Sequence, residues 1–189
     1  MLVIPDSSPV YRVLSIDPGT DTLGLALLEV NLETKKIVVP HARTFSGDRM
    51  SRRFGEYIEV HGEKAARLYA HEVGLTEIME LWLPHAIICE SPFLGRFPQA
   101  FAALVECLVS IRRAVYNYDR TITLETVDPP TAKKSVGVVG KGTTKEDVKN
   151  ALKRLDGRTL VVIPDLDSLD EHSIDAIAVG YHKCQQFML

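Results

Sequence analysis

The chain has 189 residues, of which 46% are hydrophobic and 25% charged, and its formal net charge is −3. This composition predicts one globular domain with a sizeable core. No apolar run is long enough to cross a bilayer, and the first residues lack the pattern of a signal peptide. We therefore expect a cytoplasmic protein without a membrane partner. The three cysteines, Cys89, Cys107 and Cys184, are scattered without a CxxC pair, which favours reduced thiols and gives no sign of a zinc site.

Residues 12–30 predict two strands joined by a tight turn. A β-rich run ends at Asp17, the pair Pro18 and Gly19 breaks it, and a second extended apolar stretch follows. A carboxylate at the end of a buried strand suits Mg²⁺, which prefers oxygen ligands. Asp before Pro-Gly is also common turn chemistry, so on this stretch alone both interpretations of Asp17 stay open.

A third strand is expected over 36–45, with Pro40 at an edge or bulge. The segment 46–62 is polar and contains Arg49, Arg52 and Arg53, and we interpret it as a mobile surface loop. It is either a solvated linker or an arm that contacts phosphates, and we favour the linker.

Helical spacing of apolar residues predicts a helix over 63–83, which Pro84 stops. The run 85–90 (HAIICE) has the length of a buried strand and ends in Glu90. Open α/β sheets place their ligands at the carboxyl ends of strands, so Glu90 and Asp17 form a matching pair.

A helix over 98–116 carries apolar residues almost all round, so it is either buried in the core or covered by a second chain. In a chain this short we favour a homodimer contact. The alternation in 121–127 predicts a strand.

The stretch 131–155 predicts one or two helical turns over 131–136, then a Gly-rich loop and a second helix. A capping box of Thr143 and Glu146 is expected to begin this second helix, and Gly157 to end it. Seven basic side chains stand here against two acids: Lys133, Lys134, Lys141, Lys145, Lys149, Lys153 and Arg154. Lysine-rich helix faces are often only solvated. Lysines beside a Gly-rich loop at a helix N-terminus suit phosphates better, so we favour a phosphate-binding face.

A short extended piece is expected over 159–163, and the final helix begins near His172. His172 and Asp175 are three residues apart, so they share one side of its first turn. Asp175 alone is explained equally well by the helix dipole. Together with the two strand-end acids, this pair provides oxygen and imidazole ligands for two ions about 4 Å apart, the pattern of a metal-dependent nuclease.

Four stretches resemble the RuvC family of Holliday-junction resolvases: SIDPGTDTLGLAL, ARLYAHEVGLTEIMELWLPHAIICESPF, PPTAKKSVGVVGKGTTKEDV and HSIDAIAVGYHK. The resemblance covers most of the chain. It implies an α/β, RNase H-like fold with a mixed central sheet of about five strands flanked by helices, as one nuclease domain over 1–189. A phage-encoded member, acting in the host cytoplasm, fits the same pattern.

The resemblance also implies site residues. Asp17, Glu90, His172 and Asp175 match the catalytic, metal-binding set for two Mg²⁺ ions, with Mn²⁺ as a substitute. Phe93 matches an aromatic that wedges into the junction, and an exposed aromatic can stack on an unpaired base. Lys133 and Lys145 match basic positions that contact DNA, and Lys134 and Lys141 lie in the same basic segment. The resemblance also implies a homodimer, which nicks a four-way junction with paired, symmetric cuts.

Some features depart from the family. Segments 31–62 and 156–171 are longer than usual and the net charge is acidic, so the choice between four-way junctions and other branched DNA stays open. Asp170 and Glu171 compete with His172 as ligands. Two other functions remain: a branched-DNA-binding module without cleavage, and an RNase H-like nuclease acting on RNA or duplex DNA. An actin-like or sugar-kinase ATPase would need a second matching half, which 189 residues hardly accommodate.

Overall fold

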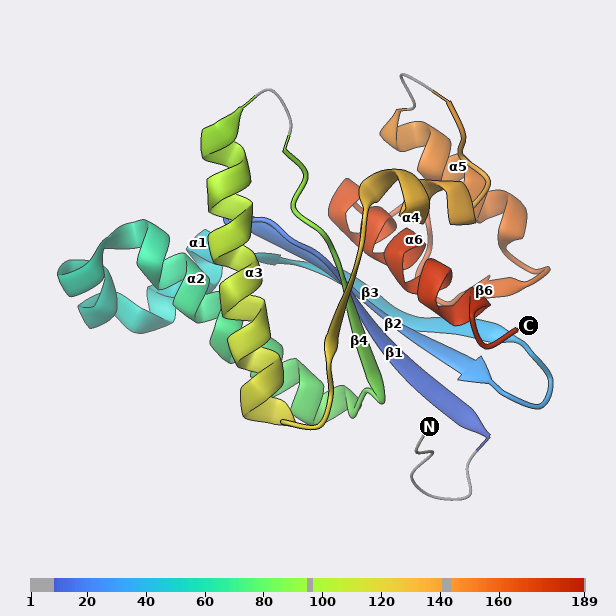
Figure 1. Cartoon of the computed structure of the whole chain (residues 1–189), viewed down its shortest axis with the longest axis horizontal. Coiled ribbons are helices and arrows are strands. Elements are labelled where there is room, and N and C mark those ends of the chain that lie inside the picture. Colours follow the sequence, from blue (N-terminus) through green and yellow to red (C-terminus); the bar gives the residue numbers. More distant parts are fainter. Residues whose placement is uncertain (1–8, 95–96, 141–143, 189) are drawn as a thin grey trace.

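The computed structural model describes residues 9–94, 97–140 and 144–188, and a mixed sheet of six strands organises it (Figure 1). The strands are β1 (Val10–Asp17), β2 (Thr22–Asn31), β3 (Ile37–Ser46), β4 (Ala86–Glu90), β5 (Leu124–Val127) and β6 (Leu160–Val162). The helices are α1 (Gly47–Ser51), η1 (Arg52–Phe54), α2 (Gly55–Trp82), α3 (Pro98–Tyr118), α4 (Pro129–Ser135), α5 (Lys145–Leu155) and α6 (Glu171–Gln185). None of these helices has the length and apolar character that a bilayer crossing requires.

The strand order is β5-β4-β1-β2-β3-β6. The first three strands form an antiparallel meander, as the sequence predicts, and β4 lies parallel to β1. The expected α/β sheet is confirmed, and the short extended piece after α5 adds a sixth strand that pairs with the start of β3. Opposite β2, the register of β3 shifts between Val38 and His41, which places Pro40 in an irregularity where its missing N–H costs no ladder bond.

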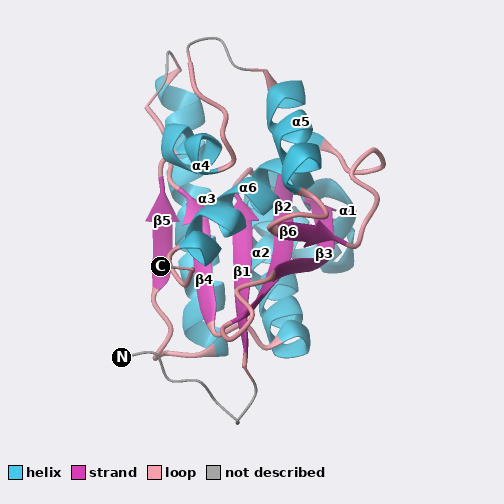
Figure 2. Cartoon of the chain, turned by 90° about the vertical axis from the view of Figure 1, so that its right-hand side faces the viewer, coloured by secondary structure: helices cyan, strands magenta, loops and turns pink. Residues whose placement is uncertain are grey.

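Helices cover both faces of the sheet (Figures 1 and 2). Side chains alternate along a strand, so β1 sends Val13 into one core and Leu14 and Ile16 into the other. The first core packs against α4, α5 and α6, and the second against α2 and α3. Both faces of β1 are therefore buried, which fixes its register and leaves only its end accessible.

The predicted loop over 46–62 is wrong, because this segment forms α1, η1 and the first two turns of α2. Ser46 caps α1 by accepting a hydrogen bond from the Arg49 N–H. Gly62, with φ 81° and ψ 165°, breaks α2 internally. The predicted helix over 63–83 is therefore confirmed as the part of α2 beyond this break.

One further local prediction needs correction. The capping box of α5 consists of Thr144 and Asp147, one residue later than expected, and Thr143 lies outside the described residues. Gly157 follows that helix with φ 73°, as its predicted closing role requires. The helix α3 is not enclosed by its own chain, because Val105, Val109 and Tyr116 are exposed on its outer face.

Candidate active site

Asp17 and Glu90 end two neighbouring parallel strands. The β1–β4 register pairs Ile16 with Cys89, and each acid is the next residue along its strand. Both strands are buried up to this point, so the chain turns towards solvent only at the carboxylates. Two acids from distant parts of the sequence are therefore held at one edge of the sheet.

The helix α6 crosses the sheet with its first turn above this edge. Asp170 caps the helix by accepting a hydrogen bond from the Ser173 N–H at 2.9 Å, and it also accepts one from the Thr44 hydroxyl at 2.6 Å. Asp170 thus has a structural role at the cap. Below the helix, the Ser15 hydroxyl donates to the Ala176 carbonyl at 2.7 Å, which anchors α6 on β1.

Glycines allow this close approach of helix and sheet. A Cβ at Gly24 in β2 would lie 2.2 Å from the His172 carbonyl oxygen, and a Cβ at Gly180 in α6 would lie 2.1 Å from Leu28 Cδ1. Contacts this short do not occur for real side chains, and because the atoms facing Gly24 are backbone, this position requires glycine for α6 to lie at this height; the atoms facing Gly180 belong to side chains. The height of the helix sets where His172 stands relative to Asp17.

His172 links the two strands of the opening hairpin. Its Nδ1–H donates to Asp17 Oδ2 at 2.8 Å, and its Nε2 lies 2.9 Å from the Thr22 hydroxyl. The hydrogen bond to Asp17 raises the pKa of His172, since a carboxylate favours the imidazolium. Asp17 is only 13% exposed, so its charge sits in a partly desolvated place with one direct cationic partner.

At Glu90 the surroundings favour the neutral form of the side chain instead of the charged one. Burial and, after it, the nearby negative charges of Asp17 and Asp175 together raise its pKa to about 8, against the influence of Lys133. Asp128, which follows β5, contributes in the same sense. The edge of the sheet is therefore a concentration of acids whose mutual repulsion favours either protonation or a cation.

The chain was compared with known proteins. No protein-family model matches it. The crossover junction endodeoxyribonuclease RuvC of Beijerinckia indica is 25% identical over 190 aligned residues, which cover 94% of this chain and 88% of that protein. The structure of Thermus thermophilus RuvC in complex with a Holliday junction superposes with a TM-score of 0.69 at 19% identity, covering 94% of this chain and 96% of that one.

The yeast mitochondrial Holliday junction resolvase superposes with a TM-score of 0.67 at 14% identity, covering 96% of this chain and 80% of that one. The sequence match spans nearly the whole chain, and the same fold recurs over the same span. The chain is thus similar to RuvC in sequence, and to RuvC and the yeast resolvase in fold, over nearly its whole length. The resemblance read from the four sequence stretches is thereby confirmed.

In this RuvC-like chain the oxygen donors suit a hard divalent cation. Asp17 and Asp175 lie close enough to Glu90 for their negative charges to contribute, after burial, to its raised pKa. Within the described ranges, however, no three His, Cys, Asp or Glu side chains converge closely enough to hold an ion by themselves. Asp17 Oδ2 instead accepts the hydrogen bond from His172 Nδ1 at 2.8 Å.

The predicted DNA-contacting residues fall into two groups. Phe93 is 64% exposed, so it is not an ordinary core residue. With Lys133, Lys134 and Val139 it lines a hollow of about 380 Å³ between the loop after β4 and α4. Lys141 lies outside the described residues, and of Lys145 only the backbone at the start of α5 is described.

Two residues of this RuvC-like site were missed at the sequence level. Thr22 begins β2, and nothing in its neighbourhood marks it as a partner of His172. Asp128 had a usable signal, because it directly follows a third parallel strand, at the sheet edge where Asp17 and Glu90 end theirs. Its own pKa is lowered by hydrogen bonds from Thr131, since it caps α4.

Proposed function

We propose that this chain is a metal-dependent endonuclease that cuts four-way junctions and related branched DNA. The observation that carries the proposal is the meeting of Asp17, Glu90 and the first turn of α6 at one edge of the sheet, in a chain with the RuvC-like fold. A carboxyl group such as that of Glu90, whose pKa is raised by burial and by neighbouring carboxylates, is typical of catalytic sites.

In this proposal Asp17, Glu90 and Asp175 would hold the cations, and His172 would join them through Nδ1 once that nitrogen has lost its proton and its contact with Asp17. Two Mg²⁺ ions, for which Mn²⁺ substitutes, would lower the pKa of water and stabilise the leaving oxygen of the phosphodiester. The residues of the chain then have separate tasks. Asp17 and Glu90 supply oxygen donors from rigid strands, and Thr22 orients the His172 ring through Nε2. His172 carries a proton on Nδ1 while it bonds Asp17, and releasing that contact frees the carboxylate for a cation.

The hollow beside the acids supports binding of branched DNA. Phe93 offers an exposed ring to a base at the crossover, and Lys133 and Lys134 offer ammonium groups to phosphates. Lys133 is close enough to lower the pKa of Glu90, so a phosphate held by Lys133 would lie next to the acids.

We further propose that two copies associate through α3. Ala102, Val105, Val109 and Tyr116 recur at intervals of three, four and seven residues, which makes a straight stripe on the outer face of the helix. Val109 is 50% exposed and Tyr116 is also open to solvent. A stripe with this spacing suits packing against the same helix of a second copy. Such a dimer would carry two sites for paired cuts.

Cleavage assays with matched variants test the proposal. Asp17→Asn and Glu90→Gln keep the shape of each side chain but remove the charge. We expect both to abolish cutting of a four-way junction in Mg²⁺ while junction binding in EDTA stays within about twofold, because phosphate contacts dominate affinity. Wild-type cutting by either variant would refute the ligand assignment.

The same assay distinguishes the alternatives. A four-way junction, a flap, a linear duplex and an RNA–DNA hybrid are compared, each with Mg²⁺ or EDTA. Paired symmetric nicks in the junction support the proposal. Binding without cuts would favour a binding module, and cutting of the linear duplex or the hybrid at a similar rate would favour a general RNase H-like nuclease.

A further inference from the structure

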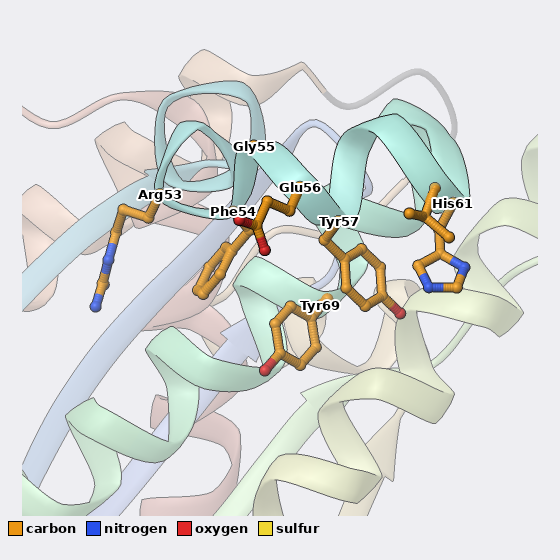
Figure 3. A pocket seen from close by; sticks show the side chains of 8 residues that line it. Arg53, Phe54, Gly55, Glu56, Tyr57, His61 and Tyr69 are labelled. Carbon is orange, nitrogen blue, oxygen red and sulfur yellow. The ribbon is translucent and has the colours of Figure 1, made fainter.

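An aromatic pocket lies outside the site described above, on the segment after β3. It has a volume of about 560 Å³ and is lined by residues of η1 and α2: Arg53, Phe54, Gly55, Glu56, Tyr57, Val60, His61 and Tyr69 (Figure 3). Its three principal rings lie in a row in Figure 3, from Phe54 through Tyr69 to Tyr57. Nothing in the proposed cleavage reaction uses them.

The break at Gly62 creates the pocket. In a continuous helix Tyr57 and Tyr69 would lie about 18 Å apart along the axis, since each residue rises about 1.5 Å. Here their ring centroids are 4.7 Å apart and the rings are nearly parallel, at 8°. Gly62 permits this by adopting φ 81° and ψ 165°, a region that other residues avoid. The chain thus folds back so that two tyrosines stack.

The walls of the pocket combine flat rings with opposite charges. Phe54 meets Tyr69 edge-on at 5.0 Å, and the Arg53 guanidinium lies 5.7 Å from the centroid of Phe54. Arg53 is fixed by two hydrogen bonds to Glu77, at 2.9 and 3.2 Å. Glu56 stands on the same wall as an acceptor (Figure 3). Such walls suit a flat, neutral heterocycle that carries both donors and acceptors, whereas a bare phosphate would meet the Glu56 carboxylate.

The pocket belongs to the same end of the sheet as the acids. Ser46, the last residue of β3, pairs with Thr22, whose hydroxyl contacts His172. The next residue, Gly47, begins α1, and its N–H donates a hydrogen bond to the Asp21 carbonyl at 2.7 Å. Arg49 and Arg52 are exposed on this short connection. A DNA strand that leaves the acids along this segment would meet two guanidinium groups and then the aromatic pocket.

We propose that the pocket binds an unpaired DNA base on a strand that extends from the branch point. This deepens the proposed function and rests on it for the identity of the nucleic acid. Stacking of a base on an aromatic side chain is tolerant of sequence, because every base has a π-face. The pocket would therefore favour branched DNA with a single-stranded portion over fully paired junctions, without reading its sequence.

Binding measurements in EDTA test this without cleavage. Two probes are used: a fully paired four-way junction, and the same junction with a ten-thymine single strand on one arm. One stacked base is worth between about fivefold and about a hundredfold in affinity, so the wild type should bind the extended junction tighter by a factor in that range. We expect Tyr57→Ala and Gly62→Ala to remove this gain and to bind the fully paired junction like the wild type.

Control variants make the result specific. Tyr57→Phe keeps the ring and should keep the gain, whereas Tyr57→Leu keeps apolar bulk and should lose it. Leu81→Ala truncates an exposed apolar side chain at the far end of α2 and should change nothing. Thermal unfolding of each variant identifies any that fail to fold, and Gly62→Ala tests the pocket geometry without removing a lining side chain, because a Cβ there meets no atom within 4 Å.

The outcomes separate the two proposals. If the extension gives no gain to the wild type, or if Tyr57→Ala and Gly62→Ala retain the gain, the base-binding inference is overturned. Decaproline is tested in parallel, because aromatic grooves also hold proline-rich chains. Decaproline binding that depends on Tyr57, without a gain from the DNA extension, would overturn the base-binding inference in favour of a peptide site. If the wild type neither binds nor cuts a paired junction but holds ten-thymine DNA through Tyr57, the nuclease proposal fails and the pocket assignment stands.

Discussion

Replacing Gly24 by alanine should move His172 on α6 away from Asp17 on β1 in the candidate active site. The new Cβ would lie 2.2 Å from the His172 carbonyl oxygen and 2.5 Å from its carbonyl carbon. Non-bonded carbon and oxygen atoms approach to about 3.3 Å, so the first turn of α6 must move by about 1 Å. Both atoms belong to the helix backbone, so neither is the end of a flexible side chain.

The displacement carries both an energetic and a kinetic cost. Overpacking of this kind destabilises a protein by about 1–3 kcal/mol. Moving His172 by about 1 Å from Asp17 disturbs a contact of 2.8 Å, and such misplacement can cost about a hundredfold in rate. We expect Gly24→Ala to fold with a lowered melting temperature and to cut a four-way junction about a hundredfold more slowly in Mg²⁺, with little change in junction binding in EDTA.

Gly180→Ala is the matched control. Its Cβ would also collide, but with Leu28 Cδ1 and the Ser15 hydroxyl, which are side-chain atoms that can rotate, and it lies about 12 Å along α6 from His172. It should lower the melting temperature by a similar amount and leave most of the cleavage rate intact, with both variants assayed well below their melting temperatures. A Gly24→Ala protein that cuts at the wild-type rate would refute the argument that the height of α6 sets the site.

Three further predictions concern DNA binding, assembly and acid stability. Lys133→Ala should weaken junction binding and reduce the slope of log affinity against log salt by about 1, and an unchanged slope would remove Lys133 from the phosphate contacts. Val109→Asp should convert a dimer to a monomer in sedimentation velocity, whereas Leu81→Asp, at a still more exposed side chain on α2, should not; a wild-type monomer would exclude the α3 interface. His71 is buried and its Nε2–H donates to the Thr20 carbonyl at 3.1 Å, and burial lowers its pKa below the ordinary 6.5. The unfolded state therefore binds the proton more readily, so stability is full above about pH 6.5 and falls by up to about 1.4 kcal/mol per pH unit below it. Urea unfolding of wild type and His71→Gln at several pH values should show a shallower loss in the variant, and parallel curves would contradict the assignment to His71.

The sequence predicts best where burial and topology agree. The run ending at Asp17 and the run ending at Glu90 are apolar on both faces, and buried parallel strands have few ways to lie in a sheet. Their pairing was therefore predictable. The part of α2 beyond Gly62 was also predictable, because apolar side chains recur at helical spacing up to the stop at Pro84.

The rest depends on contacts between distant residues. The helices over 47–61 lack a helical repeat of apolar residues, and they are held by ring contacts such as that of Tyr57 with Tyr69, which no local pattern reveals. The capping box was misplaced because Thr143 and Thr144 precede two adjacent acids, so two registers are locally equivalent. Thr22 was missed since its role arises only when α6 arrives from 150 residues away.

The place of α6 over the middle of the sheet has a consequence for biosynthesis. Asp17 and Glu90 meet once β4 has paired with β1, yet His172 and Asp175 join them only after α6 has left the ribosome and docked. A growing chain therefore exposes the acids at a bare sheet edge before the imidazole reaches them. Contacts over such long sequence separations form late and slowly. Under the proposed function, a copy that lacks α6 would lack two of the four proposed ligands, His172 and Asp175, and would not cut DNA.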